Sequence, residues 1–251
     1  MIYQAHRGVS TEYPENTMPA FEAALREGYT YIETDPLVTR DGVTVLLHDK
    51  TLNRTCRNGD GSELIEKLSL SDLTYEEALA YDAGVAFDAK FRGTRIPKLS
   101  ELLSLAEGKN VTVKIDNRMQ NFSDDELESL FSTVELSSAR VGFTSSSLAF
   151  IKRLLLRFPD AEIHYDGLVT EETLRELGAL VGDNRLVVWL AIESPNTAWV
   201  KIPKATRELC ELVKHYALLG LWILHEDAEL ETAKALGADI IETTGRLKPE
   251  K

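Results

Sequence analysis

Short β-rich runs alternate with amphipathic helical patterns along almost the whole chain, and this alternation limits the possible folds more than any other feature. Strands joined by helices run parallel, because each helical crossover returns the chain to the same end of the sheet. Nine runs are predicted as strands: Ile2–His6, Thr30–Asp35, Val43–His48, Val111–Asp116, Arg140–Phe143, Ala161–Tyr165, Arg185–Ala191, Leu219–Leu224 and Ala238–Glu242. The 251 residues suffice for eight strand–helix units closed into a ring, so the sequence predicts an α/β fold, a (β/α)8 TIM barrel.

Nine candidates exceed the eight strands of such a barrel. We expect one of Ala161–Tyr165, Arg185–Ala191 or the final run to lie outside it. Residues 51–98 break the alternation with an irregular, turn-rich stretch in which one short helix is predicted near Thr74–Asp82. We interpret 51–98 as an insertion after the third strand, within a single domain that covers residues 1–251.

The charge balance limits the choice of partners. With 28 Lys and Arg against 41 Asp and Glu, the net charge is −13, which argues against nucleic-acid partners and stable membrane association. No signal peptide is visible, no apolar run approaches the roughly 18–20 residues of a membrane span, and two cysteines are too few for a disulfide framework. A cytoplasmic globular protein is therefore predicted, with its oligomeric state undetermined.

Ionisable residues follow the first four predicted strands, at the ends that form the active-site mouth of a TIM barrel. They are His6, Arg7, Glu33, Asp35, His48, Asp49, Lys114 and Asp116. Glu33 and Asp35 are two residues apart on a strand, so they point to one side and repel each other unless a cation lies between them. Mg²⁺ or Ca²⁺ suits such oxygen ligands, although scattered acids on a solvated edge strand would give the same pattern.

Two of the five histidines lie at the ends of separate predicted strands, and each is followed by a polar loop. His6 precedes Arg7 and His48 precedes Asp49, so an opposed pair of imidazoles could pass protons to and from a substrate. A lone histidine is more often structural, and His164, His215 and His225 are interpreted in that way.

Arg7 and Lys114 bring positive charge to the same rim of an acidic protein, as an anionic substrate requires. Lys114 would be a surface lysine if its strand were not part of the barrel. Together with the histidines and carboxylates, these cations indicate metal-assisted phosphoryl chemistry. No Gly-rich phosphate loop of the Walker type is present, which disfavours nucleotide hydrolysis of that kind.

The first fifty-five residues carry a specific resemblance. The segments His6–Gly8, Pro14–Thr17, Ile32–Asp35, Thr39–Gly42 and His48–Asp49, in this order, resemble the glycerophosphodiester phosphodiesterases. Later segments resemble the family more loosely, namely Ile96–Leu99, Leu221–Leu224 and Gly237–Ile241.

This resemblance implies a (β/α)8 barrel that hydrolyses glycerophosphodiesters to glycerol 3-phosphate and an alcohol with a divalent metal, Mg²⁺ or Ca²⁺. It also implies a mechanism in which the glycerol 2-hydroxyl attacks phosphorus and water then opens a cyclic phosphate. Carried over to this sequence, His6 and His48 resemble the acid–base pair, Glu33 and Asp35 the metal ligands, Arg7 a phosphate contact and Trp222 a substrate contact.

One departure from the family concerns the metal. The family's fourth strand usually reads Ile-Glu-Ile-Lys, and here Lys114 matches the lysine whereas Thr112 stands at the ligating Glu. Asp116 lies two residues further on the same face and is predicted as the replacement ligand.

Two alternatives to this enzyme remain open. Thr112 leaves room for a phosphate-ester-binding barrel with weakened catalysis. Apolar residues near the mouth, such as Phe87 and Phe91, leave room for a lysophospholipid head-group hydrolase, although their spacing of four also suits simple packing.

Overall fold

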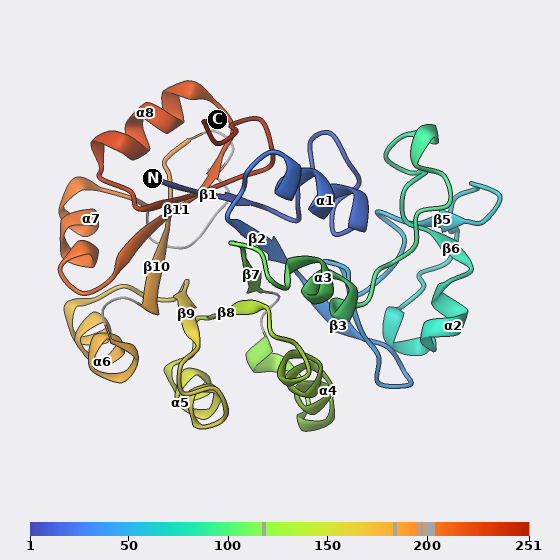
Figure 1. Ribbon diagram of the computed structural model, residues 1–251, viewed down its shortest axis with the longest axis horizontal. Coiled ribbons are helices and arrows are strands. Elements are labelled where there is room, and N and C mark those ends of the chain that lie inside the picture. The colour runs from blue at the N-terminus through green and yellow to red at the C-terminus, as the bar shows by residue number, and fades with distance from the viewer. Residues whose placement is uncertain (117–118, 183–184, 195–196, 198–203, 251) are drawn as a thin grey trace.

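The computed structural model describes residues 1–116, 119–182, 185–194, 197 and 204–250 (Figure 1). Eight parallel strands close into a barrel in the order β1, β12, β11, β10, β9, β8, β7, β2. Their bounds are β1 (Ile2–Ala5), β2 (Tyr31–Thr34), β7 (Thr112–Ile115), β8 (Arg140–Ser145), β9 (Glu162–Tyr165), β10 (Leu186–Ala191), β11 (Leu218–Leu224) and β12 (Ile240–Thr243). The predicted TIM barrel is confirmed.

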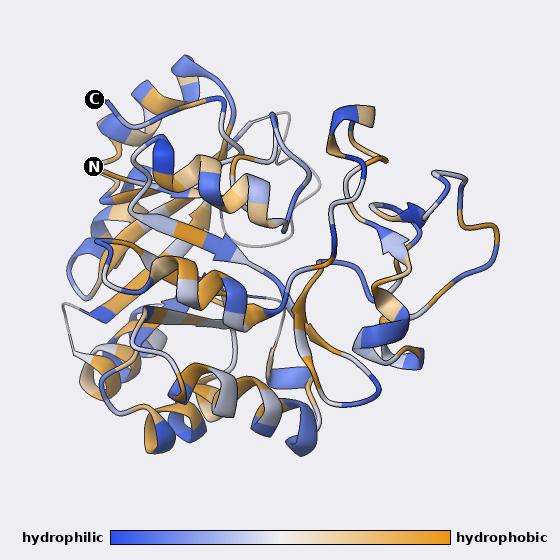
Figure 2. Ribbon diagram, turned by 45° about the vertical axis from the view of Figure 1, so that its right-hand side comes forward, coloured by the Kyte–Doolittle hydropathy of each residue, from blue (hydrophilic) through white to orange (hydrophobic). Residues whose placement is uncertain are grey.

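Helices connect successive barrel strands and surround them (Figure 1). They are α1 (Met18–Arg26), α3 (Leu99–Ala106), α4 (Asp124–Glu135), α5 (Leu148–Arg157), α6 (Glu171–Val181), α7 (Arg207–Lys214) and α8 (Asp227–Ala235). Figure 2 shows apolar residues along the barrel strands and mixed polar and apolar residues along the helices, as expected for amphipathic helices on a buried sheet. Within the described ranges, no helix is both long and apolar enough to cross a bilayer.

The surplus strand is the third one, so the expectation that it would be among Ala161–Tyr165, Arg185–Ala191 or the final run was wrong. Those runs form β9, β10 and β12, whereas β4 (Thr44–Leu46) pairs antiparallel with β3 (Pro36–Val38) outside the barrel. The turn between them contains Asp41-Gly42, with Gly42 at φ +79°, and Asp-Gly is typical of β-hairpin turns. A prediction based on strand periodicity alone does not use this signal. In the barrel, β2 therefore pairs directly with β7. The chain leaves the barrel at Pro36, and residues 36–98, up to the start of α3, are called the excursion below.

The excursion between β2 and α3 has its own small apolar cluster. It also contains β5 (Arg57–Asn58), β6 (Tyr81–Asp82) and α2 (Tyr75–Ala78), which lie to the right of the barrel in Figure 1. The buried members of the cluster are Leu37, Val45, Leu47, Leu52, Cys56, Leu70, Ala78, Ala83 and Ile96. The helix predicted near Thr74–Asp82 is present but short, because the chain enters β6 soon after it.

The interior of the barrel is unusually polar. Buried Gln4, Lys114, His164 and Glu242 come from four different barrel strands. Lys114 on β7 contacts Glu242 on β12, and these strands are not neighbours in the barrel, so the two side chains meet within its lumen. Polar groups buried in this way require partners, and those partners build the site described below.

A glycine between β1 and α1 fixes the loop that carries Arg7. Gly8 has φ +79°, and a Cβ there would lie 2.7 Å from the Ala20 carbonyl carbon. We expect Gly8→Ala to lower the free energy of unfolding by about 2–3 kcal/mol, measured by urea denaturation. Gly28→Ala is the matched control, because Gly28 has φ +87° but open space around it, and we expect a loss of only about 1 kcal/mol there. Equal losses in the two variants would show that the contact with α1 does not matter.

Candidate active site

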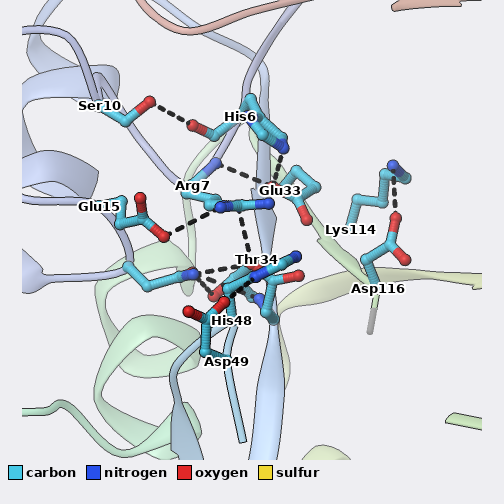
Figure 3. Close-up of polar contacts among 12 residues, drawn as sticks. His6, Arg7, Ser10, Glu15, Glu33, Thr34, His48, Asp49, Lys114 and Asp116 are labelled. Carbon is cyan, nitrogen blue, oxygen red and sulfur yellow. Dashed lines mark hydrogen bonds and ion pairs between the residues drawn. The ribbon is translucent and has the colours of Figure 1, made fainter. Parts of the chain in front are cut away.

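A pocket of about 820 Å³ opens where the barrel strands end. The eight residues predicted for the site all line it: His6, Arg7, Glu33, Asp35, His48, Lys114, Asp116 and Trp222. Ten of the pocket residues and their neighbours are labelled in Figure 3. The structure therefore brings the predicted site residues together, and their roles depend on the contacts that each one makes.

His6 faces two buried carboxylates. Its Nε2 lies 3.6 Å from Glu242 Oε1 and 4.0 Å from Glu33 Oε2, and ligand atoms of the three residues lie within 4.8 Å of one another. Burial lowers the pKa of His6 well below its usual value, and the nearby charges of Arg7 and Lys114 lower it further. The lowered pKa favours the neutral imidazole, which is the form that can accept a proton.

The sequence analysis did not select Glu242. Like Glu33 on β2, it follows two apolar residues near the end of its strand. Thr244 stands where a second acid would be needed, so the paired-carboxylate signal that selected Glu33 and Asp35 was lacking. Glu242 accepts a hydrogen bond from Gln4 Nε2 at 2.5 Å and lies 3.4 Å from Lys114 Nζ. Burial raises its pKa, and the charge of Lys114 opposes that rise.

Asp35 and Asp116 have other charged partners. Asp35 lies 3.1 Å from Arg7 Nε and accepts a hydrogen bond from Asn16 Nδ2 at 2.8 Å. Asp116 lies 3.1 Å from Lys114 Nζ (Figure 3). In the described part of the chain, the histidine–carboxylate group around His6 includes Glu33 but neither of these two acids.

The loops beside β1 and β2 hold Arg7 in a rare backbone conformation. Arg7 and Asn16 have φ values of +57° and +54°, in the left-handed region that is uncommon for residues other than glycine and that Asn adopts more readily than Arg. The Arg7 backbone N–H donates to Glu33 Oε2 at 2.8 Å, and Asn16 Oδ1 accepts from Thr34 at 2.8 Å. These contacts explain why both residues keep strained conformations beside the carboxylates.

His48 reaches the pocket from the excursion rather than from a barrel strand. Its Nδ1 lies 2.5 Å from Asp49 Oδ1, and Arg54 Nε donates to Asp49 Oδ2 at 2.7 Å. Arg54 also donates to Glu15, which accepts from Arg7, so an ion-pair network joins the loop after β1 to the excursion. The Arg54 hydrogen bond lowers the pKa of Asp49 to about 2, which keeps this carboxylate ionised next to His48.

The buried acids suit a hard divalent cation. Burial raises the pKa of Glu33 well above its usual value, and repulsion from Asp35 and Glu242 adds to the rise. Burial alone would lower the pKa of Lys114, but Glu242, Asp116 and Glu33 raise it, so Lys114 is the ammonium that offsets them. Among the described residues, four acidic side chains (Glu33, Asp35, Asp116 and Glu242) face two cations, Lys114 and Arg7, which leaves excess negative charge when the acids are ionised. Oxygen ligands are those that Mg²⁺ and Ca²⁺ prefer.

The fold and the pocket together define the class of protein: a (β/α)8 barrel whose active-site end suits acid–base chemistry on a phosphate ester. The model of the glycerophosphoryl diester phosphodiesterase family matches residues 6–218. The chain belongs to the glycerophosphoryl diester phosphodiesterase family.

Similar proteins support this assignment. A glycerophosphodiester phosphodiesterase from Caldanaerobacter subterraneus subsp. tengcongensis is 43% identical over 112 residues, 45% of this chain and 43% of that protein. One from Bacillus altitudinis is 36% identical over 121 residues, 47% of this chain and 46% of that protein. The chain therefore matches less than half the length of these curated relatives.

Solved structures share the fold at low sequence identity. A putative glycerophosphoryl diester phosphodiesterase from Silicibacter pomeroyi has a TM-score of 0.78 and 20% identity, covering 97% of this chain and 90% of that one. An Oleispira antarctica phosphodiesterase in complex with the product sn-glycerol-3-phosphate has a TM-score of 0.77 and 16% identity, covering 98% and 94%.

Proposed function

We propose that this protein hydrolyses small glycerophosphodiesters to glycerol 3-phosphate and an alcohol, with a divalent metal. The observation that carries the proposal is the convergence of His6, His48, Arg7 and Lys114 on one pocket with buried carboxylates. Family membership and a structural neighbour named with sn-glycerol-3-phosphate support the same substrate class. The cytoplasmic location stays a prediction.

Two imidazoles divide the proton transfers. His6 is neutral and buried, so it accepts the proton of the glycerol 2-hydroxyl as that oxygen attacks phosphorus. His48, oriented by Asp49 through Nδ1, protonates the departing alcohol oxygen from its other nitrogen. A cyclic phosphate results, and water opens it with the two roles exchanged.

Arg7 and Lys114 position the phosphoryl group. The Arg7 side chain is 17% exposed and anchored by Glu15 and Asp35, so its guanidinium is held at the wall of the pocket. Lys114 is 4% exposed and supplies a fixed point charge from the lumen. Trp222 lines the same pocket and is assigned to substrate contact. Such preorganised cations stabilise charge that develops on phosphoryl oxygens.

The metal would be held by the carboxylates at the bottom of the pocket. Glu33 and Glu242 lie together, and Asp35 and Asp116 line the same space. When bound, the ion offsets the charge of the acids and of the phosphoryl oxygens. His6 remains free for proton transfer, because hard cations take oxygen ligands in preference to imidazole.

The structure gives less support to the two alternative functions, a phosphate-ester-binding barrel and a lysophospholipid head-group hydrolase. Thr112 supplies no carboxylate, but Glu242 brings one to the site from β12, so the missing Glu does not by itself indicate weakened catalysis. Phe91 packs against Tyr13 and Phe87, with ring centroids 5.5 and 5.7 Å apart, which favours a packing role over binding of a lipid chain.

A substrate panel tests the proposal directly. We expect release of glycerol 3-phosphate from glycerophosphocholine, glycerophosphoethanolamine and glycerophosphoglycerol in the presence of Mg²⁺ or Ca²⁺, with loss of turnover in EDTA. Lysophospholipids are the comparison substrates, assayed under the same conditions. Binding of glycerol 3-phosphate without turnover of any ester would indicate a binding barrel instead. Turnover confined to lysophospholipids would indicate a lysophospholipid head-group hydrolase.

Asp49 is expected to act through His48. Asp49→Asn keeps the shape but removes the charge that holds the imidazole, so kcat should fall by about 10- to 100-fold with little change in KM. Steady-state kinetics measure this split. Asp160→Asn, on an exposed position between α5 and β9, is the control that should leave both constants unchanged. Unaltered kcat in Asp49→Asn would remove Asp49 from the mechanism.

A further inference from the structure

A second histidine in the barrel has both ring nitrogens engaged. His164 on β9 is fully buried, and its Nδ1 lies 2.9 Å from Trp189 Nε1 on β10. An indole N–H can only donate, so Nδ1 accepts and the ring proton sits on Nε2. That Nε2 lies 2.8 Å from Glu162, which in turn accepts from the Tyr31 hydroxyl at 3.0 Å. One tautomer and one ring orientation are thereby fixed.

The Trp189 indole also contacts the candidate active site. Trp189 lines the pocket, and Lys114 Nζ lies 4.7 Å from its ring centroid, a cation–π contact. Lys114 also pairs with Asp116 and Glu242. A continuous series of contacts therefore runs from Glu162 through His164 and Trp189 to the ammonium group in the pocket.

Two glycines make room for this pair. A Cβ at Gly142 on β8 would lie 2.6 Å from His164 Nε2, and one at Gly220 on β11 would lie 2.5 Å from the Trp189 ring. Glycine within a strand weakens it and often marks a close approach by another group. The neighbouring strands on both sides thus accommodate the imidazole and the indole without a side chain.

We propose that His164 and Trp189 are positioning residues that hold the Lys114 ammonium in place for the phosphoryl group. A lysine has a flexible stem, and three carboxylates surround this one, so its ammonium needs a further contact to stay in one position. The indole face supplies that contact, and the hydrogen bond to His164 fixes the orientation of the face. The inference rests on the proposed function, and it assigns a role to a histidine that the sequence analysis interpreted as structural.

Variants at two positions separate the contacts. His164→Leu removes both hydrogen bonds, His164→Gln retains a donor toward Glu162 only, and His164→Asn retains an acceptor near Nδ1 for Trp189. Trp189→Phe keeps an aromatic face but removes the indole N–H. We expect His164→Leu, His164→Gln and Trp189→Phe to lose about tenfold in kcat/KM and in affinity for glycerol 3-phosphate, while His164→Asn recovers most of both.

Coupling to Lys114 is the decisive readout. If His164 acts through Lys114, His164→Leu in a Lys114→Met background should cost nothing further, whereas independent effects would multiply. The NMR signal of the Trp189 indole Nε1–H can be assigned from its absence in Trp189→Phe. Its chemical shift should change in His164→Leu and remain near the wild-type value in His164→Asn. Near-UV circular dichroism and urea unfolding show whether each variant folds.

The outcomes distinguish this inference from the proposed function. Suppose that the wild type is active. Unchanged kinetics in all folded variants, or effects of His164→Leu and Lys114→Met that multiply, would then overturn the positioning role without affecting the proposed hydrolase function. A wild type that does not hydrolyse esters would reject the proposed function, and calorimetry with glycerol 3-phosphate would still decide whether His164 positions Lys114. Loss of affinity in His164→Asn equal to that in His164→Leu would also count against the inference.

Discussion

Replacing His6 or His48 by alanine is expected to lower kcat on glycerophosphodiesters by about 10²- to 10⁴-fold while KM changes little. Each substitution removes one member of the proposed proton-transfer pair, and the substrate contacts proposed for Arg7 and Lys114 remain. Steady-state kinetics with glycerophosphocholine measure the loss. The double variant should be little worse than either single one, because both residues act on the same reaction step.

The His6 variant also tests which atoms hold the metal. If the carboxylates are the ligands, His6→Ala should bind Mg²⁺ or Ca²⁺ with nearly wild-type affinity by calorimetry. Loss of metal binding in His6→Ala would make His6 a ligand and would remove it as a base, since a coordinated nitrogen cannot accept a proton. His215→Ala, at an exposed position directly after α7, is the control for replacing a histidine elsewhere.

The barrel could be predicted because its signals are local. The barrel strands are short runs rich in β-formers, and several helices begin with a Ser or Thr cap, as Ser123 and Glu126 show at the start of α4. The excursion could not be placed in the same way. Val43–His48 has the composition of a barrel strand, and it is the Asp41-Gly42 turn before it, not its own pattern, that indicates a hairpin with Pro36–Val38.

Most members of the site could be predicted, but Glu242 and the contacts between the side chains could not. The eight ionisable residues selected by their position at predicted strand ends, His6 to Asp116, all line one pocket. Which acids meet depends on the closure of the barrel, which brings β12 next to β1 and places Glu242 beside Gln4 and near His6. Closure pairs the first barrel strand with the last, and the spacing of residues along the sequence does not predict that pairing.

The polar lumen follows from the same geometry. An ordinary TIM barrel fills its interior with branched apolar side chains, whereas here Glu33, Lys114, His164 and Glu242 are buried in it. Each of these groups costs stability unless it is paired, so the interior is arranged for charge rather than for packing. Relieving that charge should therefore stabilise the protein and impair its site.

Glu33→Gln is expected to have opposite effects on stability and on metal binding. Gln has the same shape and can still accept the Arg7 backbone hydrogen bond, but it removes a buried charge that Asp35 and Glu242 repel. In EDTA at pH 8 we expect the free energy of unfolding to rise by about 1–2 kcal/mol. Affinity for Mg²⁺ or Ca²⁺ should fall by about 100-fold or more, with a matching loss of metal-dependent turnover.

The gain in stability should depend on pH in a defined direction. Because burial raises the pKa of Glu33 in the folded protein, ionisation of this group disfavours folding, so wild type loses stability as pH rises through that pKa. Below the ordinary pKa of Glu the wild-type side chain is protonated, and the difference from Glu33→Gln should nearly vanish. Urea unfolding in EDTA at pH 3.5 and 8 measures this difference, with exposed Glu22→Gln on α1 as the control. A Glu33→Gln protein that is less stable than wild type at pH 8 would show that Glu33 is a net stabilising ion partner, and the excess negative charge proposed for the metal site would then have to be abandoned.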